Sequence, residues 1–192
     1  MNTRHNHYFT ADNAERRKWQ NPEAILDDIG LKPALTFIDV GCGGGFFTMP
    51  AARITRKSGK VYGIDVNSDY VNELRELATK ENLNNIDLTV GKAEEVVVCE
   101  GCADIVFFGV VLHDFEDATK VILNANKMLK PNGRLFNLDW KKERIDIGPP
   151  FQKRFSEDYA AELIKAAGFI VENIKPSGRY HYLISAIKQP ER

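Results

Sequence analysis

Cysteine is scarce in this sequence, with three residues in 192, and no apolar run approaches the roughly 20 residues that a membrane span needs. The cysteines, Cys42, Cys99 and Cys102, are odd in number, and no charged and then apolar leader precedes them. A secreted domain stapled by disulfides is therefore not expected. These absences predict a cytoplasmic protein that is not inserted in a membrane.

An excess of charge of either sign is also absent. Lys and Arg number 26 and Asp and Glu number 27, so the formal net charge is -1. Proteins that bind nucleic acids or anionic lipids usually carry a strongly basic surface, which this composition does not provide. A small-molecule partner is therefore expected, and neither nucleic acid nor membrane is.

Two cysteines have the C-x-x-C spacing of metal and redox sites, Cys99-Glu100-Gly101-Cys102. A structural zinc ion needs four ligands, and no second pair exists, so no metal site is expected. A redox pair would stand at a helix start after a strand, whereas this pair precedes a predicted strand. We expect a loop with two incidental thiols.

The apolar pattern predicts one α/β domain over residues 1–192, with residues 1–21 as a polar lead in front of it. Short runs rich in Val, Ile and Phe alternate with segments of helical periodicity, which is typical of a doubly wound, mostly parallel sheet. The predicted strands are 36–40, 61–65, 86–90, 103–108, 134–140, 169–174 and 180–187.

Helix caps and turn residues mark where the predicted helices and strands begin and end. Helices are expected after the caps Asn21, Asn67 or Ser68, and Ser156, and also over 46–55 and 121–129. Pro131, Asn132 and Gly133 are expected to separate the helix at 121–129 from the fifth strand. Only residues 175–179 join the last two strands, which is too short for a parallel crossover, so an antiparallel hairpin is predicted.

A glycine-rich turn follows the first predicted strand, at the sheet edge where open α/β folds bind ligands. Gly41, Gly43 and Gly45 have the spacing G-x-G-x-G, and Phe46 stands where a dinucleotide motif needs its third small residue. Asp39 would repel a pyrophosphate but can accept hydrogen bonds from an ammonium group. The turn therefore favours a ligand other than a dinucleotide.

A second carboxylate ends the second predicted strand. Asp65 can accept hydrogen bonds from both hydroxyls of an adenosine ribose. The alternative interpretation is that the glycines only make a tight turn and that Asp39 and Asp65 cap strand ends.

With these residues the sequence resembles the class I S-adenosylmethionine (SAM)-dependent methyltransferases from about Pro22 to Ile187. The matching motifs are Asp39-Val40-Gly41-Cys42-Gly43-Gly44-Gly45, Gly63-Ile64-Asp65-Val66 and Leu129-Lys130-Pro131-Asn132-Gly133. The resemblance implies a seven-stranded, mostly parallel sheet whose last strand is antiparallel, and SAM as the methyl donor. The residues that it implies for binding SAM are Asp39, Gly41, Cys42, Gly43, Gly45, Asp65 and Val66, with Gly109 at the exit of the fourth strand.

One motif departs from the family. The turn after the third strand often reads Gly-Asp-Ala there, and the Asp bonds the adenine amino group, but this chain has Gly91-Lys92-Ala93-Glu94. Because Lys92 cannot accept that bond, adenine recognition is expected from the backbone near Ala93 or from Glu94.

Methyl transfer from a sulfonium needs no protein nucleophile, because positioning can supply most of the acceleration. His113, after the fourth strand, is a candidate general base, with Asp139 and Trp140 as candidates to line the acceptor pocket. Alternatively, His113 bonds a backbone carbonyl and Trp140 only packs. The sequence motifs of nucleic-acid amino and cytosine methyltransferases are missing, which again favours a small-molecule acceptor.

Two segments are candidates to cover the ligand. Residues 141–155 are too long for a tight connection and predict a lid, or alternatively a disordered loop. Tyr8, Phe9 and Trp19 are aromatics in the polar lead and predict that it packs over the ligand, or alternatively on bare protein surface.

Three other functions remain open from the sequence. They are a methyltransferase acting on proteins, an NAD-dependent oxidoreductase and a SAM-binding module without catalysis.

Overall fold

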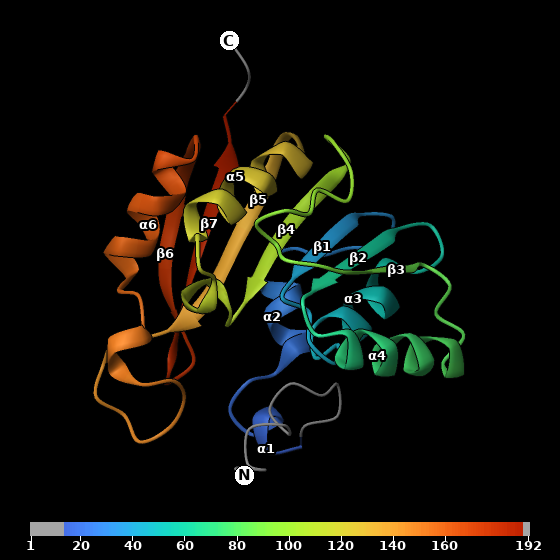
Figure 1. Cartoon of the computed structure of the whole chain (residues 1–192), viewed down its shortest axis with the longest axis horizontal. Coiled ribbons are helices and arrows are strands. Elements are labelled where there is room, and N and C mark those ends of the chain that lie inside the picture. Colours follow the sequence, from blue (N-terminus) through green and yellow to red (C-terminus); the bar gives the residue numbers. More distant parts are fainter. Residues whose placement is uncertain (1–13, 190–192) are drawn as a thin grey trace. The chain divides into compact units, whose positions relative to one another are not determined.

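The computed structural model describes residues 14–189, whose helices and strands are shown in Figure 1. The chain divides into two compact units that meet in sequence between Lys92 and Ala93. That these units make up one domain stays a prediction. No helix of residues 14–189 is long and apolar enough to cross a membrane.

The first unit is a parallel three-stranded sheet with helices packed against it. Its strands lie in the order β3, β2, β1, and helices α3 and α4 pack on them. The elements are α1 (Ala14–Arg17), α2 (Pro22–Asp28), β1 (Thr36–Val40), α3 (Thr48–Thr55), β2 (Lys60–Asp65), α4 (Ser68–Lys80) and β3 (Ile86–Val90).

Side-chain caps set where two helices of this unit begin. Asn21 accepts a hydrogen bond from the backbone of Ala24, and Asn67 accepts bonds from the next turn of α4. Asn67, rather than Ser68, is therefore the cap of α4. Helix α3 begins at Thr48, two residues later than predicted, because Phe46 and Phe47 still belong to the glycine-rich turn.

The second unit contains the antiparallel hairpin. β4 and β5 are parallel, and β7 pairs antiparallel with both β5 and β6, in the order β4, β5, β7, β6 (Figure 1). The hairpin prediction is confirmed, but its second strand lies between β5 and β6. The elements are β4 (Ala103–Gly109), η1 (Leu112–Asp114), α5 (Ala118–Met128), β5 (Leu129–Trp140), η2 (Phe151–Lys153), α6 (Glu157–Ala166), β6 (Phe169–Ser177) and β7 (His181–Lys188).

Strand β5 begins earlier than predicted. Ala103 pairs with Leu129, whereas Ile105 already pairs with Arg134, so residues 130–133 form an irregular bulge within the strand. Asn132 has a φ of 63°, in the left-handed region that asparagine tolerates. The prediction that Pro131, Asn132 and Gly133 separate the helix from the strand is therefore wrong; they lie inside β5.

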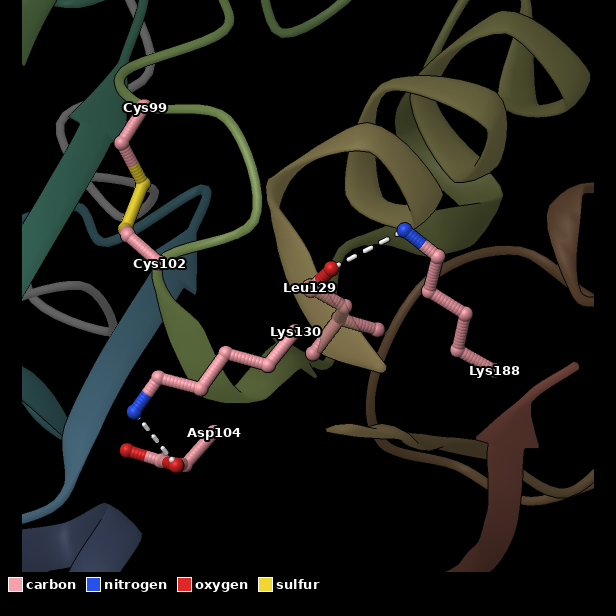
Figure 2. Close-up of a disulfide and its surroundings, with 6 residues drawn as sticks. All are labelled: Cys99, Cys102, Asp104, Leu129, Lys130 and Lys188. Atoms are coloured by element: carbon pink, nitrogen blue, oxygen red, sulfur yellow. Dashed lines mark hydrogen bonds and ion pairs between the residues drawn. A yellow bond between two sulfur atoms is a disulfide. The ribbon is translucent and has the colours of Figure 1, made fainter. Parts of the chain in front are cut away.

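Cys99 and Cys102 are joined by a disulfide (Figure 2). The expectation of two incidental thiols is therefore wrong, because a tight turn with Gly101 at a φ of 57° brings the cysteines together. The N–H groups of Gly101 and Cys102 donate to the carbonyls of Lys127 and Met128 at the end of α5. The disulfide turn thus satisfies carbonyls that the helix itself leaves without donors.

Two lysines hold the neighbouring strand ends, as Figure 2 shows. The Nζ of Lys130 lies 2.7 Å from Asp104 Oδ1, and the Nζ of Lys188 donates to the carbonyl of Leu129 at 3.0 Å. These contacts tie the starts of β4 and β5 to the end of β7, next to the disulfide turn.

Reduction of this disulfide is expected to lower the free energy of unfolding by about 2 kcal/mol, because the bond closes only a short loop in the unfolded chain. Urea unfolding with and without dithiothreitol measures the loss. The Cys99→Ser/Cys102→Ser double variant should match the reduced protein and should not respond to the reductant. A wild type that is equally stable with and without reductant would contradict the prediction.

Candidate functional site

The glycine-rich turn connects β1 to α3 and exposes backbone that side chains would otherwise cover. Gly41, Gly43 and Gly45 have φ values of 75°, 50° and 91°, all in the region that favours glycine. The N–H groups of Gly41 and Cys42 donate to the carbonyl of Ile64 on β2, at 2.7 and 3.0 Å. The turn is thereby fixed against the neighbouring strand.

Two residues of this turn have structural roles that the sequence did not reveal. A Cβ on Gly45 would lie 2.3 Å from Leu74 Cδ1, so α4 packs against this glycine. The side chain of Cys42 is buried beside Gly63 and Leu74 and points into the core. Cys42 can therefore serve a ligand only through its backbone.

Asp65 at the end of β2 is held in a defined orientation. Its Oδ2 accepts the N–H of Gly43 at 2.8 Å, and its Oδ1 accepts the N–H of Asn67 at 2.9 Å. A carboxylate has about four acceptor positions, so two further donors can bind while these contacts persist. This arrangement fits a ribose with two free hydroxyls. Val66, next in the chain, is 65% exposed and offers an apolar surface beside it.

Asp39 is buried, with only 1% of the residue exposed, and its Oδ2 accepts a hydrogen bond from the Thr48 hydroxyl at 2.6 Å. Burial raises the pKa of Asp39 to about 7, although the Thr48 hydrogen bond and the charge of Arg16 oppose the shift. Sequence reasoning missed Thr48, whose position nine residues downstream carries no local signal. Contact between Asp39 and the ligand stays a prediction.

The part of the polar lead that the structure describes, residues 14–21, packs on the glycine-rich turn through the side chain of Arg16. The guanidinium of Arg16 lies 3.9 Å from the centre of the Phe46 ring, and its Nε donates to Gln20 Oε1 at 2.6 Å. Burial lowers the pKa of Arg16 to about 9, and the charge of Asp39 partly offsets this. The sequence singled out aromatics of the lead and missed Arg16, which makes this contact; a ligand-covering role of Trp19 stays a prediction. Tyr8 and Phe9 lie outside the described residues.

The Thr48→Val variant is expected to lose about 1 to 3 kcal/mol of unfolding free energy at pH 8, where Asp39 is ionised and its buried carboxylate loses the hydroxyl donor. The loss should be smaller at pH 5, because Asp39 is then protonated. This direction of the pH dependence follows because the Thr48 hydrogen bond lowers the pKa of Asp39. Removing the hydrogen bond raises that pKa further, so stability is lost mainly where Asp39 is ionised.

Urea unfolding of Thr48→Val at both pH values tests this, with Thr48→Ser as the control that keeps the hydroxyl. An equal loss at pH 5 and pH 8 would show that Thr48 contributes only packing.

In the second unit, one buried side chain shapes the segment expected to recognise adenine. The Nδ2 of Asn124 on α5 donates to the carbonyls of Ala93 and Glu94, both at 3.0 Å. The Glu94 carboxylate lies 3.5 Å from the N–H of Asp117 at the start of α5. The sequence did not indicate a role for Asn124, because a polar residue on a helix does not reveal which distant residue it will bond.

The exit of β4 is strained. Gly109 pairs with Leu138, and the next residue, Val110, has a φ of 68° while its N–H donates to the carbonyl of Leu138 at 2.7 Å. A branched side chain rarely adopts this conformation, which costs on the order of 1–3 kcal/mol. The strained turn leads directly into η1, which carries His113.

His113 lies between two carboxylates. Its Nδ1 is 2.7 Å from Asp139 Oδ1, which also accepts the N–H of Trp140 at 2.8 Å, and its Nε2 is 3.3 Å from Asp114 Oδ2. Burial alone would lower the pKa of His113, but the hydrogen bond and charge of Asp139, with the charge of Asp114, outweigh it and raise the pKa.

His113 and Asp139, which sequence reasoning named separately, are therefore a bonded pair. The ring is held by carboxylates rather than by the backbone carbonyl of the alternative interpretation. With its pKa raised, the imidazole carries a proton over more of the neutral range and acts there as a donor. A role as general base would require that proton to leave first.

Residues 141–155 form an ordered loop around the guanidinium of Arg154. This group donates to the carbonyls of Lys141, Glu143, Ile147 and Pro149 at 2.7 to 3.3 Å. Gly148 lies against the Trp140 ring, where a Cβ would come within 2.9 Å. The disordered alternative is therefore wrong, and Trp140 packs under this loop. Its role as a lid stays a prediction.

No cluster of three or more metal-ligating side chains occurs in residues 14–189.

Comparison with known proteins identifies the family. Residues 31–173 match a family model described as a methyltransferase domain. A SAM-dependent methyltransferase from Aquifex aeolicus has a similar structure, with a TM-score of 0.87, 30% sequence identity, and 92% of this chain and 94% of that chain covered.

The curated relatives are longer proteins that this chain matches over part of their length. The ubiquinone/menaquinone biosynthesis C-methyltransferase UbiE of Vibrio vulnificus is 29% identical over 164 residues, which cover 85% of this chain and 61% of that protein. UbiE of Hydrogenovibrio crunogenus is 25% identical over 173 residues, 90% of this chain and 65% of that protein. This chain thus spans less than two thirds of these relatives.

These likenesses confirm the predicted fold class, an α/β protein with seven mostly parallel strands and a C-terminal antiparallel hairpin. That Asp65 binds a ribose stays a prediction. The chain belongs to the family of SAM-dependent methyltransferases with the class I fold.

Proposed function

We propose that this protein transfers the methyl group of SAM to a small-molecule acceptor. The observation that carries the proposal is the carboxylate of Asp65, which Gly43 and Asn67 orient while two of its acceptor positions remain for the ribose hydroxyls. The residues proposed to hold the donor in the first unit are Asp39, Gly41, Cys42, Gly43, Gly45, Asp65 and Val66; Ala93, Glu94 and Gly109 are proposed from the second.

In this reaction an electron pair of the acceptor forms the new bond to the methyl carbon. The carbon–sulfur bond breaks, its electron pair stays on sulfur, and S-adenosylhomocysteine is the second product. Alignment of the two reactants can supply most of the acceleration. The protein residues hold the donor, orient the acceptor and take up or hold a proton.

His113 and Asp139 are proposed as the residues that act on the acceptor. Asp139 orients the ring through Nδ1, and Nε2, which lies 3.3 Å from the exposed Asp114 carboxylate, is the atom proposed to face a reactant. The names of the UbiE relatives describe C-methylation in quinone biosynthesis, which supports a small-molecule acceptor for this chain. A cytoplasmic location stays a prediction, and two of the three thiols that favoured it are paired.

The proposal is tested by incubating the protein with methyl-labelled SAM and a fractionated cell extract. We expect S-adenosylhomocysteine and label in an acid-soluble product. Label that precipitates with acid would instead indicate a protein acceptor. Saturable SAM binding without S-adenosylhomocysteine from any fraction would indicate a non-catalytic module, and a rise in melting temperature with NADH but not with SAM would indicate an oxidoreductase.

A further inference from the structure

A histidine and a lysine from different parts of the second unit meet at one exposed carboxylate. Asp114 Oδ2 lies 3.3 Å from His113 Nε2, and Asp114 Oδ1 lies 3.6 Å from Lys153 Nζ. His113 comes from η1 and Lys153 from η2, so only the folded chain brings them together. A carboxylate thus already lies between an imidazole and an ammonium group.

The three side chains differ sharply in exposure. The His113 side chain is 2% exposed, whereas those of Asp114 and Lys153 are 45% and 63% exposed. Exposed ion pairs are weak because water and salt screen them, so Asp114 can be displaced without disturbing the fold. The buried ring cannot move as freely, since Asp139 holds its other nitrogen. His113 is thus a fixed donor, and Asp114 is a replaceable acceptor.

The loop that supplies Lys153 is basic in an otherwise balanced chain. Residues 141–155 contain five basic side chains and two acidic ones, a formal charge of +3 against -1 for the whole chain. Lys142 and Arg144 lie over the ring of Phe151, at 5.8 and 5.5 Å, and Phe151 begins η2. Two exposed cations of the loop therefore lie close to the residue that begins the short helix of Lys153. An anion, rather than a neutral or cationic molecule, suits such a surface.

We propose that His113 Nε2 and Lys153 Nζ bind a carboxylate of the methyl acceptor and that Asp114 occupies this position in the free protein. The inference rests on the proposed function and narrows its substrate class to small molecules that carry a carboxylate. The acceptor's carboxylate takes the place of Asp114, accepts a hydrogen bond from His113 and pairs with Lys153. In this role His113 and Lys153 are specificity-determining residues.

Formate tests the subsite independently of methyl transfer, because it has the size of the group that Asp114→Ala removes. Formate is titrated into this variant while the imidazole signals of His113 are followed by NMR. We expect saturable binding at least tenfold tighter than in the wild type, where Asp114 competes. Adding Lys153→Met to the variant should weaken binding about tenfold. The matched control Lys165→Met, which removes an exposed lysine paired with Glu162 on α6, should leave it unchanged.

Formate that shifts no His113 signal in Asp114→Ala, or that binds equally well with and without Lys153, would overturn the subsite. Melting curves of the variants confirm that each is folded before titration.

A second experiment separates this inference from the proposed function. Small-molecule extract is divided by ion exchange into anionic, neutral and cationic pools, and each is incubated with methyl-labelled SAM. We expect label only in the anionic pool, with a KM about tenfold higher for Lys153→Met and an unchanged kcat. Label only in the neutral or cationic pool would overturn the carboxylate subsite and leave the methyltransferase proposal standing. If no pool is labelled, the proposed function fails, and the formate titration still decides the subsite.

Discussion

Replacing Asp65 by alanine is expected to lower the affinity for SAM about a hundredfold. In the proposed function Asp65 accepts two charge-assisted hydrogen bonds from the ribose, and their loss costs about 1.5 to 3 kcal/mol each, although the losses need not add. The Asp65 carboxylate also accepts a hydrogen bond from the N–H of Gly43, so the alanine variant loses a contact that fixes the glycine-rich turn. Isothermal titration of the folded variant with SAM measures the change.

Asp65→Asn separates these two contributions. The amide oxygen can still accept the N–H of Gly43, but the neutral side chain accepts fewer and weaker bonds from the ribose. Its affinity should lie between those of the wild type and the alanine variant. As a control, the 2′-deoxyadenosyl analogue of SAM should lose little more in Asp65→Ala, because the partner hydroxyl is already absent.

If the loss of affinity from Asp65→Ala and the loss from removing the 2′-hydroxyl of SAM added in full, Asp65 would not contact that hydroxyl. If Asp65→Ala instead lost folding stability while binding SAM normally, Asp65 would be the strand-end cap of the alternative interpretation.

Replacing Asp139 by asparagine is expected to cost about 3 to 5 kcal/mol of unfolding free energy at pH 6, because the buried imidazolium of His113 loses its charged partner. Asp139 and the His113 side chain are both almost fully buried, so water cannot replace the lost contact. Urea unfolding from pH 5.5 to pH 9 measures this loss and its pH dependence.

The pH dependence has a definite sign. The pKa of His113 is raised in the folded protein above its ordinary value of 6.5. Its contribution to stability is therefore fully present below about pH 6.5 and is lost as the pH rises through the higher, folded-state value. Asp139→Asn should largely remove this slope, since the main group that raises the pKa is gone.

Asp114→Asn is the matched control for Asp139→Asn. The same carboxylate-to-amide change is made beside the other ring nitrogen of His113. Because Asp114 is exposed, we expect the free energy of unfolding to fall by less than about 1 kcal/mol. Equal losses at positions 114 and 139, or an unchanged pH slope in Asp139→Asn, would show that burial of the Asp139 pair does not govern the charge of His113.

The local features of this protein could be predicted from its sequence because they depend on neighbouring residues. Asn21 and Ser156 cap helices through bonds to residues three positions ahead. The strands β1 and β3 have the predicted bounds, since short apolar runs between turn residues define them. The glycine-rich turn and Asp65 carry their signal in spacing alone, so the family and its donor could be expected.

Only the tertiary structure decided the contacts between distant segments. Thr48 is nine residues from Asp39, and Lys153 is 39 residues from Asp114. Such pairs depend on how helices and loops pack on the strands, and no periodicity or spacing encodes them. The same holds for β7, whose place between β5 and β6 follows from burying both of its faces and pairing both of its edges. The sequence by itself thus determined most of the elements and the glycine-rich turn, whereas packing decided which charges surround His113.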